Sequence, residues 1–233
     1  MKKFIEKLKI NGEETTEKYS PKQFLLILLV AILGMAVYVM AFSIFFGNHA
    51  VTYVLSAISC ILSYRYIVGH NSFNHIIKKL LNWKTWIYGL MFGLILTAFN
   101  FSVTQIIEYI TNDISSNESS VRSMLLDEPL FAGIYVILLA PFIEEFGYRL
   151  GVFGYTKKYG KVVAYILSGL LFGLLHLTGS LSGDINLTTE LLSLVLYSLC
   201  GLILCFAYDT TNSLCVSTIA HMISNIVAVI LLF

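Results

Sequence analysis

The sequence LLAPFIEEFGYRLGVFGY, residues 138–155, decides the fold because it places three charges inside an otherwise apolar stretch. The charged residues are Glu144, Glu145 and Arg149. An Asp, Lys or Arg at the centre of a membrane helix costs about 2.5–3.5 kcal/mol on insertion scales, and we expect a similar cost for Glu. Three such groups together cost roughly 8–10 kcal/mol. We therefore expect them to have partners in other helices or to line a water-filled cavity.

The composition of the whole chain is that of a membrane protein. Of its 233 residues, 57% are hydrophobic and 12% are charged, whereas a soluble domain contains roughly 25% charged residues. The apolar runs are continuous rather than alternating, which is typical of membrane helices and not of a β-barrel. We predict an all-α, polytopic transmembrane helix bundle. The expected partner is the lipid bilayer and not a nucleic acid, and the oligomeric state is left open.

Long runs without charged residues predict about seven membrane-spanning helices. A spanning helix needs about 20 mostly apolar residues, and Gly47-Asn48-His49 divides the first run into two. The expected spans are residues 23–46, 50–68, 85–109, 129–156, 161–178, 190–208 and 212–232. A charged tail, residues 1–22, precedes them.

Basic residues indicate the orientation of these spans. Arg149 lies inside the fourth span and Arg122 falls in an acidic connection on the opposite side. The other basic residues fall in connections on one side of an alternating topology: Lys2, Lys3, Lys7, Lys9, Lys18, Lys22, Arg65, Lys78, Lys79, Lys84, Lys157, Lys158 and Lys161. The positive-inside rule places these residues and the N-terminus in the cytoplasm. Seven spans then place the C-terminus outside.

Other polar groups lie at nearly the same depth as Glu144. Glu144 is about 20 Å of helix from Lys157, His176 is about 22 Å from Lys161, and His221 is about 18 Å from Asp209. Agreement among three spans favours one buried polar site, although a lone membrane histidine is more often a packing residue than a catalyst.

An internal ion pair explains only part of the pattern. Glu145 and Arg149 are four residues apart and can pair on one face of a helix. Glu144 points about 100° away from Glu145, because an α-helix has 3.6 residues per turn. The side chain of Glu144 therefore needs another environment.

Three short motifs resemble those of a known family. EEFGYR (residues 144–149) fits EExxxR, FGLLH (172–176) fits FxxxH, and HMISN (221–225) fits HxxxN. In this order on separate membrane helices, they are similar to the CPBP (Abi) family, which includes type II CAAX prenyl proteases and bacterial proteins linked to bacteriocin maturation and self-immunity. The chain departs from the family where Tyr148-Arg149-Leu150 replaces the frequent Phe-Arg-Gly.

The resemblance implies a division of the chain and a location. Residues 23–124 would form N-terminal transmembrane helices, and residues 125–233 would form the catalytic membrane core with the last four spans. The chain would be a multi-pass protein of a bacterial cell membrane. Its substrate would be a peptide or lipidated peptide, in CAAX-type, bacteriocin or peptide-pheromone processing.

The resemblance also implies roles for individual residues in peptide-bond hydrolysis. Glu144 would be the general base that activates a water, with His176 sharing that water and its proton. His221 and Asn225 would donate hydrogen bonds to the oxyanion. Glu145, Arg149, Phe172 and Tyr148 would support these groups without acting on the substrate.

The sequence leaves two questions open: whether a metal takes part, and whether the chain is an enzyme. No cofactor is expected, but two histidines and a glutamate are also a known catalytic zinc set, although the compact HExxH motif is absent. The chain could instead be a non-catalytic scaffold or a bacteriocin self-immunity protein. A second alternative function is a proton-coupled carrier, since membrane Glu and His residues also form proton relays.

The predicted topology can be tested by cysteine labelling. A cysteine introduced near residue 118 should react with a membrane-impermeant thiol reagent in intact cells, because residues 111–128 are expected outside. A cysteine placed between Lys157 and Lys161 should react only after lysis. The opposite pattern would contradict the predicted orientation.

Overall fold

A computed structural model describes residues 8–10, 19–177 and 185–233, and every element in this part of the chain is helical. Most of the expected tail, residues 1–7 and 11–18, lies outside the described residues. The main helices are α2 (Pro21–Leu29), α3 (Met35–Phe46), α4 (Ala50–Val68), α5 (His70–Lys78), α6 (Trp83–Thr111), α7 (Ser116–Asp127), α8 (Pro129–Gly133), α9 (Ala140–Glu145), α10 (Gly154–Thr156), α11 (Lys161–Leu175), α12 (Leu187–Thr211) and α13 (Leu214–Leu232).

Short segments of another helix type interrupt or extend these helices. Three are π-helical: η2 (Val30–Gly34), η4 (Ile134–Leu139) and η5 (Phe146–Phe153). The 3₁₀ turns η3 (Lys79–Leu81) and η6 (Lys157–Tyr159) follow α5 and α10. Glu144 and Glu145 therefore lie on a short α-helical piece between two π segments, a type of distortion that is frequent at functional sites.

The predicted helix bundle is confirmed, with one correction to the number of spans. Within the described residues, six helical stretches are long and apolar enough to cross a membrane: Pro21–Phe46, Ala50–Val68, Trp83–Thr111, Pro129–Tyr159, Leu187–Thr211 and Leu214–Leu232. The span expected at residues 161–178 is instead the 15-residue helix α11, and residue 178 is not described. A helix of this length measures about 22 Å, which is less than the roughly 30 Å of the hydrocarbon layer.

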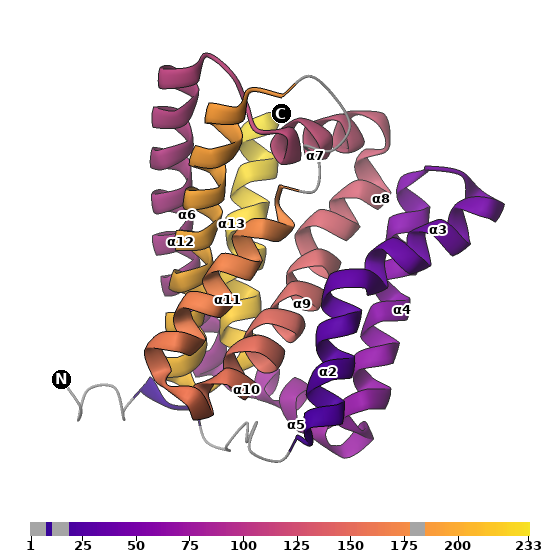
Figure 1. Cartoon of the computed structure of the whole chain (residues 1–233), viewed down its shortest axis with the longest axis vertical. Helices are drawn as coiled ribbons and strands as arrows, with labels where there is room; N and C mark the ends of the chain where they lie inside the picture. Colours follow the sequence, from indigo (N-terminus) through magenta and orange to yellow (C-terminus); the bar gives the residue numbers. More distant parts are fainter. Residues whose placement is uncertain (1–7, 11–18, 178–184) are drawn as a thin grey trace.

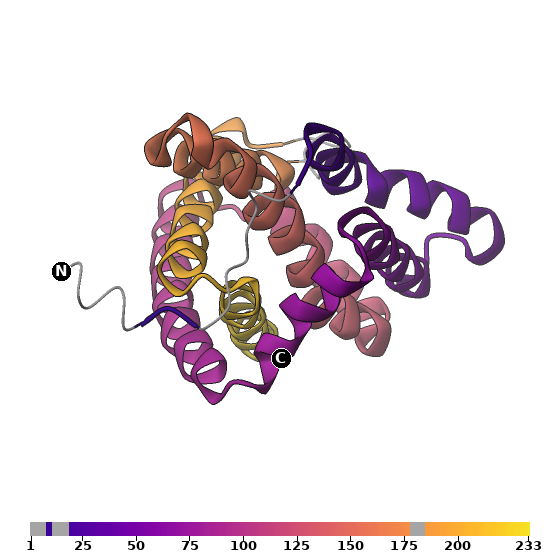
Figure 2. The same cartoon turned by 90° about the horizontal axis from the view of Figure 1, so that it is seen from below.

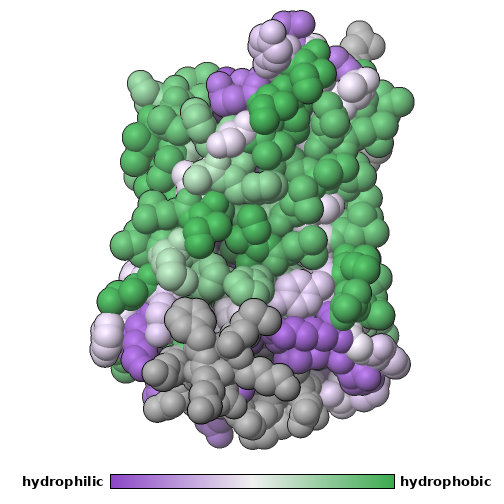
Figure 3. Space-filling view, turned by 90° about the vertical axis from the view of Figure 1, so that its left-hand side faces the viewer, coloured by the Kyte–Doolittle hydropathy of each residue, from purple (hydrophilic) through white to green (hydrophobic). Residues whose placement is uncertain are grey.

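The helices are arranged so that α6 and the helices after it form a bundle around α13. Viewed along the bundle, α13 lies in the middle, whereas α2, α3 and α4 stand to one side (Figure 2). α5 and α10 lie at one end, and α7 and the C-terminus at the other (Figure 1). Connections that were expected on the same side of the membrane therefore lie at the same end of the bundle. That the end with α5 and α10 faces the cytoplasm stays a prediction. One face shows a broad apolar band between two more polar ends (Figure 3).

Glycines spaced four residues apart let these helices approach closely. Such pairs occur in α6 (Gly89 and Gly93), in η5 (Gly147 and Gly151) and in α11 (Gly169 and Gly173). This small-xxx-small spacing is typical of tight helix contacts in membranes. An added Cβ would lie 2.5 Å from Ile219 Cγ2 at Gly89 and 2.7 Å from Ile27 Cγ2 at Gly151.

Two of these pairs set the positions of candidate site residues. An added Cβ at Gly93 would lie 3.1 Å from the carbonyl oxygen of Ala220, immediately before His221. An added Cβ at Gly173 would lie 2.9 Å from the carbonyl oxygen of Leu194, and Gly173 is three residues before His176. Close packing of α6 on α13 and of α11 on α12 therefore fixes where both histidines lie.

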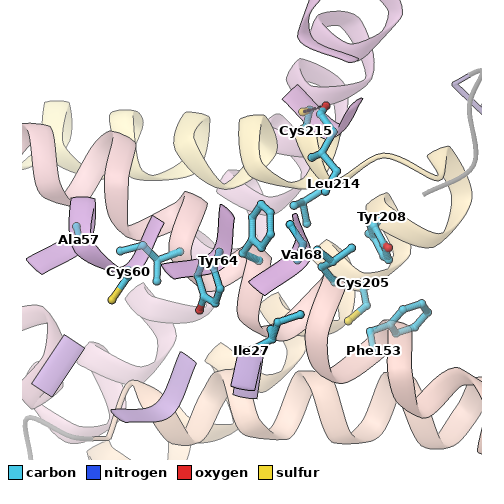
Figure 4. Close-up of a cluster of buried hydrophobic side chains, with 14 of the residues drawn as sticks. Ile27, Ala57, Cys60, Tyr64, Val68, Phe153, Cys205, Tyr208, Leu214 and Cys215 are labelled. Carbon is cyan, nitrogen blue, oxygen red and sulfur yellow. Dashed lines mark hydrogen bonds between the residues drawn. The ribbon is translucent and has the colours of Figure 1, made fainter. Parts of the chain in front are cut away.

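A buried apolar cluster holds the N-terminal helices against the rest of the bundle (Figure 4). Tyr64 of α4 is fully buried and stacks on Phe146 of η5, with ring centroids 5.0 Å apart. Phe73 of α5 packs against Phe146 as well, at 5.7 Å. All four cysteines, Cys60, Cys200, Cys205 and Cys215, are buried and unbridged, so they serve as small packing residues.

The close approach at Gly173 leads to a stability prediction. Gly173→Ala should lower the free energy of unfolding by about 1–3 kcal/mol, because the new methyl group meets the backbone of α12 and overpacks the contact. Gly133→Ala is the matched control, since nothing lies within 4 Å of an added Cβ there. Thermal unfolding of both variants in detergent measures the difference. Equal midpoints would contradict the close contact.

Candidate active site

Glu144 and Glu145 at the end of α9 face different environments. The side chain of Glu145 is fully buried, whereas that of Glu144 is 18% exposed and lines a cavity. This divergence agrees with the angle of about 100° between successive residues of a helix. One turn of helix thus supplies both a buried carboxylate and a carboxylate that faces a cavity.

Glu145 forms the expected ion pair with Arg149. Arg149 Nε lies 3.1 Å from Glu145 Oε2, and both side chains are completely buried. Arg149 Nη2 also donates to the carbonyl oxygen of Gly201 on α12 at 3.2 Å. The guanidinium carbon lies 4.5 Å from the ring centroid of Phe172 on α11. The pair therefore links the helix segment that carries it to α11 and α12.

His221 joins α13 to both glutamates. Its Nδ1 lies 3.2 Å from Glu145 Oε1, and its Nε2 lies 3.9 Å from Glu144 Oε2. The first distance is that of a long hydrogen bond, whereas the second exceeds hydrogen-bond range. Glu145 therefore orients the imidazole, and the other ring nitrogen is turned toward Glu144.

His176 lies directly after α11 and is held by its own helix. His176 Nδ1 donates to the carbonyl oxygen of Phe172 at 2.8 Å, if that nitrogen carries the proton. In a neutral ring, Nε2 is then a free acceptor. The rings of Phe172 and Tyr197 flank the imidazole, with centroids 4.7 Å and 4.4 Å away.

Tyr148 supports the site through the backbone and through Phe172. Its carbonyl oxygen accepts a hydrogen bond of 2.8 Å from Ser168 Oγ on α11. Its ring meets that of Phe172 edge-on, with centroids 5.8 Å apart. Tyr148 is buried, so the Tyr-Arg-Leu departure from the family pattern is accommodated by packing against α11.

Asn225 has a partner that the sequence did not predict. Its Nδ2 donates to the carbonyl oxygen of Val136 at 2.8 Å. In the π segment η4, the amide of Ala140 donates to Tyr135, five residues back, and Pro141 has no N–H to offer. The Val136 carbonyl is thus released from the helix ladder, and Asn225 satisfies it. The second N–H of the Asn225 amide is left for another acceptor.

A cavity of about 420 Å³ joins these groups. Its wall includes Glu144, His176, His221 and Asn225. The same cavity reaches residues of α7 and the C-terminal part of α13, so it runs from the polar level to the end of the bundle at which α7 lies (Figure 1). The structure thus gathers the four expected catalytic residues around one space.

α6 contributes polar residues to this cavity that none of the sequence motifs predicted. Thr97, Asn100, Thr104 and Glu108 line it and recur every three or four residues, which is the period of one helix face. A polar stripe in an otherwise apolar span was a readable signal. Tyr197 and Arg122 also line the cavity, and no motif marked them.

The described side chains are not grouped as metal ligands. Across residues 8–10, 19–177 and 185–233, no three His, Cys, Asp or Glu side chains are grouped closely enough to hold one. Nδ1 of His176 is already directed at the Phe172 carbonyl.

Comparison with known protein families identifies the part of the chain that carries the site. Residues 126–227 match the family described as type II CAAX prenyl endopeptidase Rce1-like. This segment is similar to that family. The resemblance expected from the three motifs is thereby confirmed, and it is to a family of membrane proteases. No curated protein and no solved structure matches the chain.

The buried ion pair of the Rce1-like segment leads to a second stability prediction. Arg149→Met should lower the free energy of unfolding by about 3–5 kcal/mol, because it leaves the Glu145 carboxylate buried without its cation. Arg122→Met is the matched control: its pair with Glu118 is also spaced i,i+4 but is partly exposed, and such pairs contribute about 1 kcal/mol or less.

Membrane abundance and thermal unfolding in detergent measure both losses. The double variant Glu145→Leu with Arg149→Met leaves neither member of the pair buried without its partner, so it should lose less stability than Arg149→Met alone. An Arg149→Met protein as stable as Arg122→Met would show that the pair does not hold the bundle together.

Proposed function

We propose that the chain is an intramembrane endopeptidase in which Glu144 activates a water molecule for peptide-bond hydrolysis. One observation carries the proposal. Glu144 Oε2 is buried and has no hydrogen-bond partner among the described residues, and its side chain lines the cavity shared with both histidines. A buried polar atom without a partner calls for an explanation, and here the exposed part of the same carboxylate faces the cavity, where it is open to a water or a substrate.

The proposed reaction proceeds by direct attack of water. Glu144 removes a proton from the water, whose oxygen forms a bond with the scissile carbonyl carbon. The carbonyl oxygen becomes an oxyanion in the tetrahedral intermediate. The C–N bond then breaks, and the proton held by Glu144 is delivered to the departing amine. His176 Nε2, a free acceptor in the neutral ring, orients the water by accepting its second hydrogen.

His221 and Asn225 are proposed to stabilise the oxyanion. Asn225 has one amide N–H that the Val136 bond does not use, and Val136 fixes the side chain so that this group is already oriented. His221 is oriented by the contact of its Nδ1 with Glu145, and its Nε2 donates to the oxyanion when both ring nitrogens carry a proton. Preorganised donors of this kind contribute about 2.7–4 kcal/mol each to transition-state stabilisation.

We propose that this chemistry needs no metal cofactor. The proposal rests on the donor set, because Asn225 suits an oxyanion better than a zinc ion, and no compact ligand motif is present. Activity that disappears in a strong chelator and returns with added zinc would contradict it and recast Glu144, His176 and His221 as ligands.

The proposed substrate is a peptide or lipidated peptide in the bilayer. The family description names a prenyl endopeptidase, and the cavity is long enough to reach from Glu144 to the end of the bundle at α7. Under the predicted orientation this end faces outside, in the cell membrane of a bacterium.

The deciding variants separate chemistry from folding. Glu144→Gln and His176→Ala should abolish release of peptides at normal membrane abundance, because both remove the activation of water. Asn225→Ala should lower the rate by about 10²–10³, because one oxyanion donor is lost. Asp113→Asn is the control, since Asp113 is exposed between α6 and α7. Mass spectrometry of peptides released from membranes of expressing cells measures the difference.

Each alternative function predicts another pattern in the same experiment. A scaffold or self-immunity protein keeps its phenotype in Glu144→Gln. A proton-coupled carrier loses pH-dependent transport in Glu144→Gln and releases no peptide in any variant. Full activity of Glu144→Gln at normal abundance would refute the endopeptidase.

A further inference from the structure

His176 needs support from outside its own helix. It follows Leu175, the last residue of α11, and its backbone has left the regular helix. The side chain is half-buried and borders the cavity, so open space lies on part of its surface. The bond from Nδ1 to the Phe172 carbonyl fixes one ring atom only. A second contact must therefore fix the plane of the imidazole.

Tyr197 of α12 supplies that contact. Its ring is stacked on the imidazole, with centroids 4.4 Å apart and an interplanar angle of 23°. Phe172 lies 4.7 Å from the same imidazole at an angle of 43°. Stacked and tilted aromatic pairs at these distances are favourable beyond the area that they bury. Tyr197 is outside all three sequence motifs.

The hydroxyl of Tyr197 connects this stack to the start of α7. It lies 3.4 Å from Ser115 Oγ and 3.4 Å from Asn117 Nδ2. Seven residues earlier on α12, Glu190 Oε1 accepts a 2.7 Å bond from the backbone N–H of Ser116. A carboxylate at the first turn of a helix is favoured by the helix dipole. The first turn of α7 is thus docked on one face of α12.

We infer that Tyr197 is a positioning residue for His176 and that it couples the imidazole to the docking of α7. The inference rests on the proposed function for its effect on turnover. Its geometric part is independent of that function, because the stack and the hydroxyl contacts are features of the fold. α7 borders the cavity through Asn117, Glu118 and Arg122. A change in how α7 docks on α12 would therefore act on His176 through Tyr197.

Three variants separate the ring of Tyr197 from its hydroxyl. Tyr197→Leu removes the stack, Tyr197→Phe keeps the ring and loses the hydroxyl, and Asn117→Ala removes one partner of that hydroxyl. Leu199→Ala is the control, because Leu199 is on the same helix and is 40% exposed. Reaction of His176 with diethylpyrocarbonate, followed by mass spectrometry, reports how freely the imidazole is presented, with the exposed His49 as internal reference.

We expect faster modification of His176 in Tyr197→Leu, little change in Tyr197→Phe, and none in Leu199→Ala. On a peptide that the wild type releases, Tyr197→Leu should lower kcat by about 10- to 100-fold with KM nearly unchanged, because a misplaced catalytic group lowers turnover rather than binding. Tyr197→Phe should retain most of kcat. In the double variant, Asn117→Ala should not lower kcat further than Tyr197→Phe alone, since both substitutions remove the same contact.

The outcomes distinguish this inference from the proposed function. Unchanged modification of His176 in Tyr197→Leu, or a kcat within about twofold of wild type, overturns the positioning role, even where Glu144→Gln is inactive. A loss of activity fully explained by lower abundance shows a packing role only. If Glu144→Gln is active but His176 is freed in Tyr197→Leu, the endopeptidase is refuted and the contact between Tyr197 and His176 stands.

Discussion

The buried pair of Glu145 and Arg149 is the constraint on which the rest of the structure depends. Both charged side chains are fully buried, and an unpaired buried charge costs several kcal/mol. Their partners must therefore come from the protein. The partners come from separate elements: the Gly201 carbonyl on α12, the Phe172 ring on α11 and His221 on α13. Satisfying one pair therefore brings the helices that carry both histidines to the same level of the bundle. Such a pair contributes little net stability compared with apolar residues, so its main consequence here is geometric.

The position of Glu144 follows from that constraint. Because Glu145 is fixed toward Arg149 and His221, its neighbour on the helix must point elsewhere, and the direction left to it is the cavity. The helix that carries both carboxylates, α9, lies between the π segments η4 and η5. His221 lies within 4 Å of both carboxylates. The same imidazole therefore lies between the structural pair and the proposed catalytic group.

The parts of this arrangement that depend on local spacing were predictable from the sequence, and those that depend on tertiary contacts were not. The pairing of Glu145 with Arg149 needs only the period of a helix, and the shared level of Glu144, His176 and His221 needs only the rise per residue and the membrane boundaries. The partner of Asn225 depends on a carbonyl released by Pro141 and a π segment, and no spacing rule reports π segments. The short length of α11 was missed because the run without charged residues continues to residue 183, beyond Leu175, the last residue of the helix. Tyr197 was missed because one tyrosine in an apolar span carries no signal until α11 and α12 are brought together by Gly169 and Gly173.

The early end of α11 explains why His176 lies where it does. A helix that stops within the membrane leaves its last carbonyl groups without partners, and irregular backbone at that depth is tolerated only against protein or a water-filled cavity. The Nδ1 of His176 donates to Phe172, one of those carbonyls, so the residue caps its own helix. The same bond leaves Nε2 of the neutral ring as the nitrogen available to the cavity. Capping and water orientation therefore require the same tautomer, and a residue without a ring donor at this position would lose both. Closing the helix end and leaving an acceptor for the proposed water are two results of one hydrogen bond.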